Sequence, residues 1–248
     1  MRKNPCVPNV RRIPWTLLAA GAAAASSASL AQSRSPELDA HLTLANDYRS
    51  RGLSQVASGA AWQLGVDYEH ASGFFVGGML ANVDYAVEGA FAAARRHSIE
   101  AYAGYAWDSG NWNFNVAVGR YIYPGVIADY DYDEIGFGAA LSNRFFYRGS
   151  YADSAYALPY SAWHHEVGFA QPLRWDVELS AAAGRYRSDL VAGGGYSHWN
   201  VGVSKVVRRV GVDLRYHDAS LEGLSYIGNP GAERWVLSVS YGFPGRLR

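Results

Sequence analysis

The residues best suited to chemistry in this sequence are charged side chains that recur at every second position within otherwise apolar segments. Asp47, Arg49 and Arg51 occupy alternate positions near the start, and Asp67 and Glu69 do so in a second segment. The charges that we expect to line the pore are Asp47, Arg49, Arg51, Asp67, Glu69, Glu100, Arg144, Arg148, Glu178 and Arg215, and further inward charges are Glu134, Glu166, Asp176 and Asp213. Every base in this set is arginine, which stays charged and forms forked hydrogen bonds with carboxylates. Such a set suits either cross-strand pairing that rigidifies a polar interior or a constriction that selects solutes by charge.

Groups that support nucleophilic or metal chemistry are sparse. His165 shares its expected strand with Ser161, but no third group is placed to orient the imidazole, and Ser197 is expected two strands away. The neighbours His164 and His165 point to opposite faces of a strand and therefore do not make a metal site. The acidic stretch 130–134 lacks the spacing of a calcium loop. The sequence predicts no enzyme, no cofactor and no metal site, with a membrane-embedded enzyme kept as an alternative.

The elements that must position the charges are β-strands, because polar and apolar residues alternate with a period of two. Trp62 to Glu69 places Trp, Leu, Val and Tyr on one face and Gln, Gly, Asp and Glu on the other. We expect twelve strands, at 41–50, 60–70, 74–84, 96–107, 111–122, 131–141, 143–153, 161–171, 174–186, 196–206, 209–218 and 233–243. Most have about the 9–11 residues that a tilted membrane-spanning strand needs.

The connections between these strands alternate in length. Five are tight turns, such as Ala71–Gly73, and six are longer loops, at 51–59, 85–95, 123–130, 154–160, 187–195 and 219–232. Membrane barrels have an even number of strands, short periplasmic turns and long outer loops. The alternation predicts an all-β fold, a single antiparallel transmembrane β-barrel of about twelve strands with both termini in the periplasm, in preference to a soluble β-sandwich.

Tryptophan also favours the barrel over the sandwich. The seven tryptophans beyond residue 31 lie near strand ends. The alternation of side chains along each strand places them on its apolar face. Trp62, Trp163, Trp199 and Trp235 are expected near the outer rim, and Trp107, Trp112 and Trp175 near the periplasmic rim. Indole rings prefer the interface between lipid and water, so two bands of this kind are typical of a barrel in lipid.

The N-terminal segment predicts export. Four basic residues precede an uncharged, Ala-rich stretch that closes on Ser29-Leu30-Ala31, so we expect cleavage between Ala31 and Gln32. This divides the chain into a signal peptide, 1–31, and an outer-membrane β-barrel domain, 32–248. The mature domain keeps 18 basic and 22 acidic residues, a net charge of −4, and loses the only cysteine, Cys6. The expected partners are outer-membrane lipid and small polar solutes, whereas the missing basic face argues against nucleic acid.

Three segments resemble a known family. Leu44–Gln55, Gly65–Gly77 and Asn82–Tyr85 resemble the TorF-type porin family of proteobacterial outer membranes, and the likeness is strongest over residues 42–123. The resemblance implies a barrel fold and an outer-membrane location.

Together the sequence predicts a porin-like channel for passive diffusion of small polar solutes or ions. Arg49 and Arg51 are the residues that we expect to control its passage, since both are placed inward on the first strand. The alternative is a structural or adhesive barrel without an open pore. Neither the solute nor an oligomeric state follows from the sequence.

Overall fold

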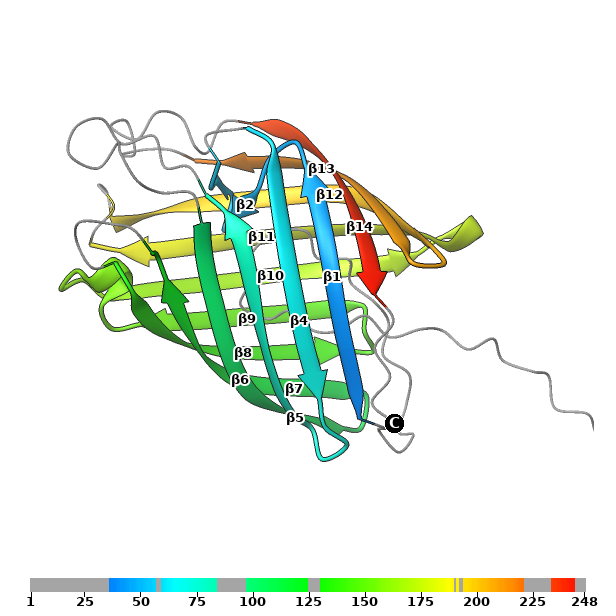
Figure 1. The fold of residues 1–248 in the computed structure, drawn as a ribbon, viewed down its shortest axis with the longest axis horizontal. Helices are drawn as coiled ribbons and strands as arrows, with labels where there is room; N and C mark the ends of the chain where they lie inside the picture. The colour runs from blue at the N-terminus through cyan, green and yellow to red at the C-terminus, as the bar shows by residue number, and fades with distance from the viewer. Residues whose placement is uncertain are drawn as a thin grey trace, which may run out of the picture.

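Twelve strands close into a single antiparallel β-barrel (Figure 1). The computed structural model describes residues 36–56, 59–83, 97–124, 130–189, 191, 194–220 and 233–243. The barrel strands are β1 (Glu37–Ala45), β4 (Ala61–Glu69), β5 (Phe74–Asn82), β6 (His97–Ser109), β7 (Trp112–Ile122), β8 (Tyr132–Leu141), β9 (Phe145–Ala152), β10 (Ala162–Pro172), β11 (Val177–Ser188), β12 (Gly195–Val207), β13 (Val210–Ala219) and β14 (Arg234–Phe243). Strands adjacent along the chain pair with each other, and β1 closes the barrel against β14. The predicted fold class is confirmed.

Four short elements lie outside the barrel wall. Strands β2 (Arg49–Ser50) and β3 (Leu53–Ser54) form a separate two-stranded hairpin. The 3-10 turns are η1 (Ala155–Ala157) and η2 (Arg174–Asp176). None of the helices among the described residues is long and apolar enough to span a membrane.

Eleven of the predicted strands agree with the structure to within three residues at each end, but the first does not. The prediction of 41–50 is wrong because β1 ends at Ala45, opposite Ala61 of β4. The next side chain replaces the backbone ladder: Asn46 Nδ2 donates to the carbonyl of Trp235 (3.1 Å), and the amide of Leu237 donates to Asn46 Oδ1 (2.9 Å). Because the side chain of Asn46 hydrogen-bonds to the backbone of β14, the backbone of the first strand can leave the wall at this point.

The strand alternation sorts residues between two faces as predicted. On β4, Leu64 and Val66 are 40% and 46% exposed on the outside, while Gln63 and Asp67 are buried on the inside. The seven tryptophans lie on the outer face, near strand ends or, for Trp175, in the η2 turn. An apolar outer face with aromatic residues at both ends is the surface that a lipid bilayer requires.

Large inward side chains pack over inward glycines of a neighbouring strand. A Cβ at Gly77 would lie 2.5 Å from the hydroxyl of Tyr102, and one at Gly202 would lie 2.9 Å from Cβ of Arg215. Because glycine has no side chain, these positions leave room for bulky polar side chains inside a narrow barrel.

The long and short connections fall at opposite ends of the barrel, which we call the long-loop end and the short-turn end. The short turns include residues 70–73, 110–111 and 208–209. The predicted signal peptide, 1–31, and the predicted loop 85–95 lie outside the described residues, as does most of the loop 219–232.

Candidate functional site

The segment that follows β1 folds back as a hairpin inside the barrel rather than continuing along the wall. Arg51 and Gly52 join β2 to β3, and both have positive φ, 51° and 84°. Two consecutive positive φ angles are characteristic of the tight type I′ turn, which matches the twist of a hairpin. The register pairs Arg49 with Ser54 and Ser50 with Leu53. The predicted outer loop 51–59 is therefore in part an ordered element.

Two of the predicted site residues hold this hairpin together. Asp47 is buried and accepts hydrogen bonds from Arg49 Nε (2.9 Å) and from the hydroxyl of Ser54 (2.6 Å). Arg49 also donates through Nη1 to the carbonyl of Gly52 (3.0 Å), across the turn. Asp47 and Arg49 are thus inside the barrel as expected, and these three hydrogen bonds lie within the hairpin segment.

Arg51, at the tip of the hairpin, reaches the opposite wall. Its Nη2 donates to both carboxylate oxygens of Glu134 on β8, at 2.7 and 2.5 Å, and its guanidinium carbon lies 5.7 Å from the centre of the Tyr186 ring on β11. The side chains of Arg51 and Glu134 are only 11% and 1% exposed. Burial opposes the charge, but the carboxylate of Glu134 and the surrounding tyrosines raise the pKa of Arg51 well above its usual range, so the pair is ionic.

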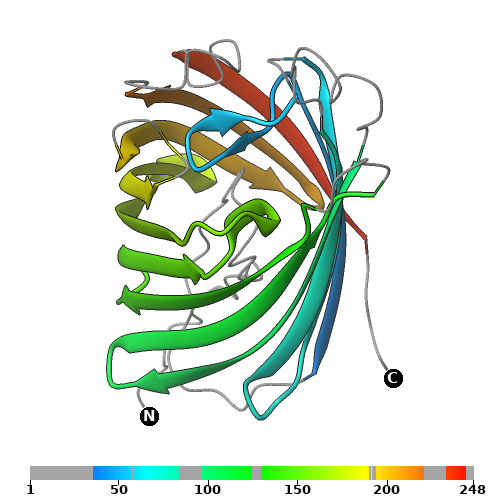
Figure 2. The ribbon, with the colours of Figure 1, turned by 90° about the vertical axis from the view of Figure 1, so that its left-hand side faces the viewer.

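Tyrosines complete a packed layer around the hairpin tip at the long-loop end. Tyr132 stacks on Tyr121, with centroids 4.7 Å apart, and contacts Tyr156 at a tilt of 53°, with centroids 5.1 Å apart. Tyr156 comes from η1, so two segments, the hairpin and η1, fold into the mouth of the barrel (Figure 2). Leu53 of the hairpin packs against the same layer. The long-loop end of the interior is consequently filled by side chains.

Below this layer the predicted charges join polar networks on the inner wall. Asp67 accepts a hydrogen bond from the hydroxyl of Tyr102 on β6. Arg215 donates to Asp213 (2.9 and 3.2 Å), to Asn200 (2.8 Å) and to Ser180 (2.8 Å), which ties together β11, β12 and β13. These networks rigidify the wall, as the structural interpretation of the charges expected.

Several inward carboxylates keep one buried oxygen without a hydrogen-bond partner among the described residues, and Oδ2 of Asp67 is one of them. Glu100 on β6 is buried, and one of its oxygens, Oε1, has no hydrogen-bond partner among the described residues. The same holds for Oε1 of Glu178, near the short-turn end of β11. Glu69 is half-buried at the end of β4, opposite Phe75. Arg148 of β9 donates to Glu166 of β10 at 3.3 Å. The role of all these residues in conduction stays a prediction.

Arg144 lies at the short-turn rim of the barrel, and its part in lining the pore stays a prediction. The residue is exposed in the three-residue turn between β8 and β9, where its amide donates to the carbonyl of Leu141 (3.0 Å). Ser142 and Asn143 adopt positive φ angles of 50° and 55°, which ends the strand before Arg144. The carbonyl of Arg144 still accepts a hydrogen bond from the amide of Ala170 on β10 (2.8 Å), so the pairing with the neighbouring strand continues past the end of β9.

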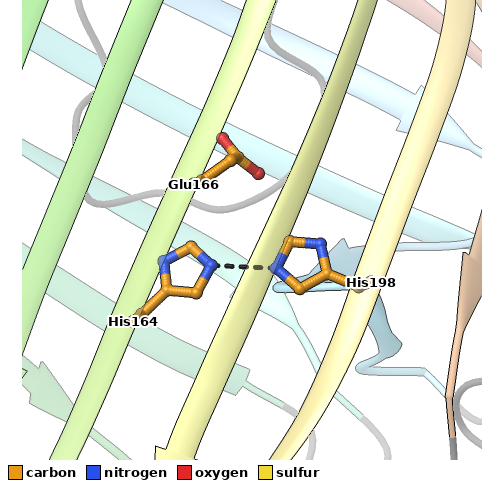
Figure 3. Close-up of side chains that lie close together, drawn as sticks. All are labelled: His164, Glu166 and His198. Carbon is orange, nitrogen blue, oxygen red and sulfur yellow. Dashed lines mark hydrogen bonds between the residues drawn. The ribbon is translucent and has the colours of Figure 1, made fainter.

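Sequence reasoning also missed a contact between two histidines. His164 faces inward and His165 outward, as predicted, but the Nε2 atom of His164 lies 2.9 Å from Nε2 of His198 on β12 (Figure 3). Glu166 lies beside them. The inward parity of β12 was available from the sequence, but the register that brings the rings together was not.

The outward histidine and the outward serine of β12 each contact a different side chain. His165 Nδ1 contacts the hydroxyl of Tyr147 (2.8 Å), while the hydroxyl of Ser197 accepts a hydrogen bond from Arg185 (3.1 Å). His165 and Ser197 lie on β10 and β12, with β11 between them, as the sequence predicted.

Comparison with known proteins gives a family and a fold. Residues 30–243 match a family model described as a bacterial protein of unknown function (Gcw_chp). The chain belongs to this family. No curated protein matches the chain. The predicted resemblance to TorF-type porins is not confirmed by name, although a porin-like barrel is supported.

The solved structures that the chain resembles include porins. A KdgM porin in complex with disordered oligogalacturonate has a TM-score of 0.52 at 8% identity, with 84% of this chain and 99% of that chain covered. A NanC porin also has a TM-score of 0.52 at 8% identity, with 84% and 100% covered. Identities this low establish the fold, that of an outer-membrane porin barrel, and leave the solute open.

Proposed function

We propose that the chain is an outer-membrane channel through which small polar solutes or ions diffuse passively, and that the β2–β3 hairpin controls the passage. An apolar outer face, a polar inner face and the fold of porins support the first part. The observation that carries the second part is the Arg51–Glu134 ion pair, which joins a hairpin of six residues to the far wall.

We infer that the hairpin must move for solutes to pass. The tip is surrounded by stacked tyrosines and by the wall residue His198, whose Cβ would lie 2.4 Å from a Cβ built at Gly52. Such packing leaves little room for a hydrated ion. Beneath the tip, the wall carries carboxylates, guanidiniums, amides and hydroxyls, which are suitable groups for a polar path.

The hairpin is suited to such movement because its internal contacts are separate from its attachment. Asp47, Arg49 and Ser54 bond to one another and would remain bonded if the tip left the wall. The attachment at the tip comprises the ion pair, the contact of Arg51 with the Tyr186 ring, the packing of Gly52 against His198 and the apolar contacts of Leu53. An element of this construction can exchange between two positions as a unit.

A proteoliposome swelling assay tests the proposal. Vesicles containing the wild-type barrel should swell in small neutral sugars and not in long oligosaccharides, and Arg51→Ala should swell faster because the tip is released. Arg144→Ala is the matched control, since it removes an exposed arginine far from the hairpin. Vesicles that never swell with either protein would contradict the channel.

A closed structural barrel is the second candidate, and the packed tyrosine layer favours it. In that case the hairpin is a permanent plug that stabilises the barrel. A measurement on the wild type is enough to distinguish the two functions. A channel passes solutes through the unmodified protein, whereas a structural barrel does not.

The location and processing of the chain belong to the same proposal. The outer face of the described barrel, with its tryptophans near strand ends, fits outer-membrane lipid as a partner. We further propose that residues 1–31 are removed as a signal peptide and that 32–248 form the mature barrel domain.

A further inference from the structure

A cluster of three metal-binding residue types lies on the inner wall, beside the hairpin. His164 and Glu166 occupy alternate positions of β10, and His198 projects from β12 (Figure 3). One ligand atom from each of the three lies within 4.8 Å of the others. We propose that His164, Glu166 and His198 bind a divalent transition-metal ion of the Zn²⁺ type inside the barrel.

The strand between the two histidines has a glycine at the position where their rings come together. Gly184 of β11 pairs with Glu166 on one side and with His198 on the other. A Cβ at this position would lie 2.4 Å from Nε2 of His198, so any larger residue would occupy the place of the ring. The imidazole planes of His164 and His198 are nearly parallel, at 17°, with centroids 5.1 Å apart.

The separation of the rings suits a shared ion. At 2.9 Å one Nε2 donates a proton and the other accepts it, so the accepting imidazole is neutral, the form that ligates metals. A tetrahedral ion with bonds of about 2.0–2.1 Å to nitrogen holds two ligand nitrogens about 3.3 Å apart. The two Nε2 atoms must therefore separate by about 0.4 Å, and the donating imidazole must move its proton from Nε2 to Nδ1 so that both Nε2 atoms can ligate the ion.

The donor set selects the class of ion. Two imidazoles and one carboxylate are ligands of zinc, and of iron, in sites that keep an open position. Calcium and magnesium prefer shells of oxygen and should bind poorly. The open position would face the interior of the barrel, where water or a solute group completes the coordination.

Arg148 is the competitor of the metal for Glu166. Its Nη1 donates to Glu166 Oε1 at 3.3 Å, a long hydrogen bond for a charged pair, and its Nε has no partner among the described residues. An incoming cation would have to displace this guanidinium. The affinity for metal should therefore rise when Arg148 is replaced by glutamine, an effect that a mere histidine–histidine hydrogen bond would not produce.

Calorimetry with Zn²⁺ on the detergent-purified, untagged and chelator-treated full chain tests the site. The wild type should bind one equivalent, and neither Ca²⁺ nor Mg²⁺ should replace it. His164→Asn and His198→Asn should each weaken binding at least about 10-fold, since even outer-shell changes cost that much. His217→Asn is the matched control, because His217 is a buried, inward-facing histidine of β13 outside the cluster, and it should bind as the wild type does.

A second measurement on the wild type alone guards against variants that fail to fold. With Cu²⁺ as the probe, electron paramagnetic resonance should show coupling to two imidazole nitrogens. Absence of Zn²⁺ binding, unchanged binding in both histidine variants, or coupling to a single imidazole would each overturn the proposal. Because these experiments measure binding and not passage, their failure would leave the channel proposal unaffected.

Discussion

Removal of the Arg51 guanidinium should release the hairpin from the barrel wall. The ion pair with Glu134 is deeply buried, with side-chain exposures of 11% and 1%. Loss of one partner of such a pair costs about 3–5 kcal/mol because the other charge stays buried without compensation. Since about 1.4 kcal/mol corresponds to a factor of ten, Arg51→Ala should raise the population with an undocked hairpin by at least about 100-fold.

A cysteine at position 56 reports undocking directly. Val56 follows the hairpin, is 4% exposed and packs with Tyr48 and Met79. The predicted mature chain has no cysteine, so Val56→Cys would be the sole target of a membrane-impermeant maleimide. The labelling rate of the Arg51→Ala protein should exceed that of the parent by the same factor as the undocked population, provided that closing is faster than labelling.

Two further variants distinguish the effect of losing the ion pair from a nonspecific destabilisation of the barrel. The double variant Arg51→Ala/Glu134→Gln removes the orphaned carboxylate and should recover most of the protection. Arg215→Ala breaks a comparably buried pair with Asp213, elsewhere on the wall, and should leave the labelling rate at the parent value. A folded Arg51→Ala protein that labels no faster than the parent would refute the attachment role of the ion pair.

Three other predictions follow from the same geometry. Under a salt gradient, the reversal potential of Arg51→Ala should shift toward cation selectivity, and that of Arg144→Ala should not; equal shifts would refute Arg51 as the filter. Brominated lipids should quench most of the indole fluorescence, because the tryptophans face outward in two bands about 25 Å apart; unquenched fluorescence would mean that they are shielded from lipid. N-terminal sequencing of the exported protein should begin at Gln32, and retention of residues 1–31 would contradict the signal peptide.

The barrel could be predicted from the sequence because its determinants are local. Each strand can be recognised by the alternation of polar and apolar residues over a short stretch, and each short turn by an interruption of this alternation such as Ala71–Gly73. Parity alone then assigns the inner and outer faces, as for Asp67 and Leu64 of β4. These inferences need no knowledge of which strands are neighbours.

The hairpin could not be predicted because the alternation continues through it. Asp47, Arg49 and Arg51 keep the period of two although the chain has already left the wall at Asn46. The turn itself, Arg51-Gly52, carries only a weak signal, since Asn-Gly and Asp-Gly are the usual pairs. Arg51 and Glu134 are 83 residues apart, so their pairing follows only from the closed fold.

The histidine cluster was missed for a related reason. His164 and His198 are 34 residues apart, and their contact depends on the registers of β10 with β11 and of β11 with β12. A shift of two residues in either register preserves every face and would still separate the rings. The alternation along a strand determines which face of the barrel a residue lies on, whereas only the register between strands determines which residues are its neighbours.

Single-channel recording in a planar lipid bilayer tests the central claim most directly. The wild-type barrel should show discrete openings and closures as the hairpin exchanges between positions. Replacement of residues 48–55 by a Gly-Ser linker of equal length should give a larger conductance without those closures. A folded wild type that carries no current at any voltage would contradict the channel, and identical gating in both proteins would contradict the role of the hairpin.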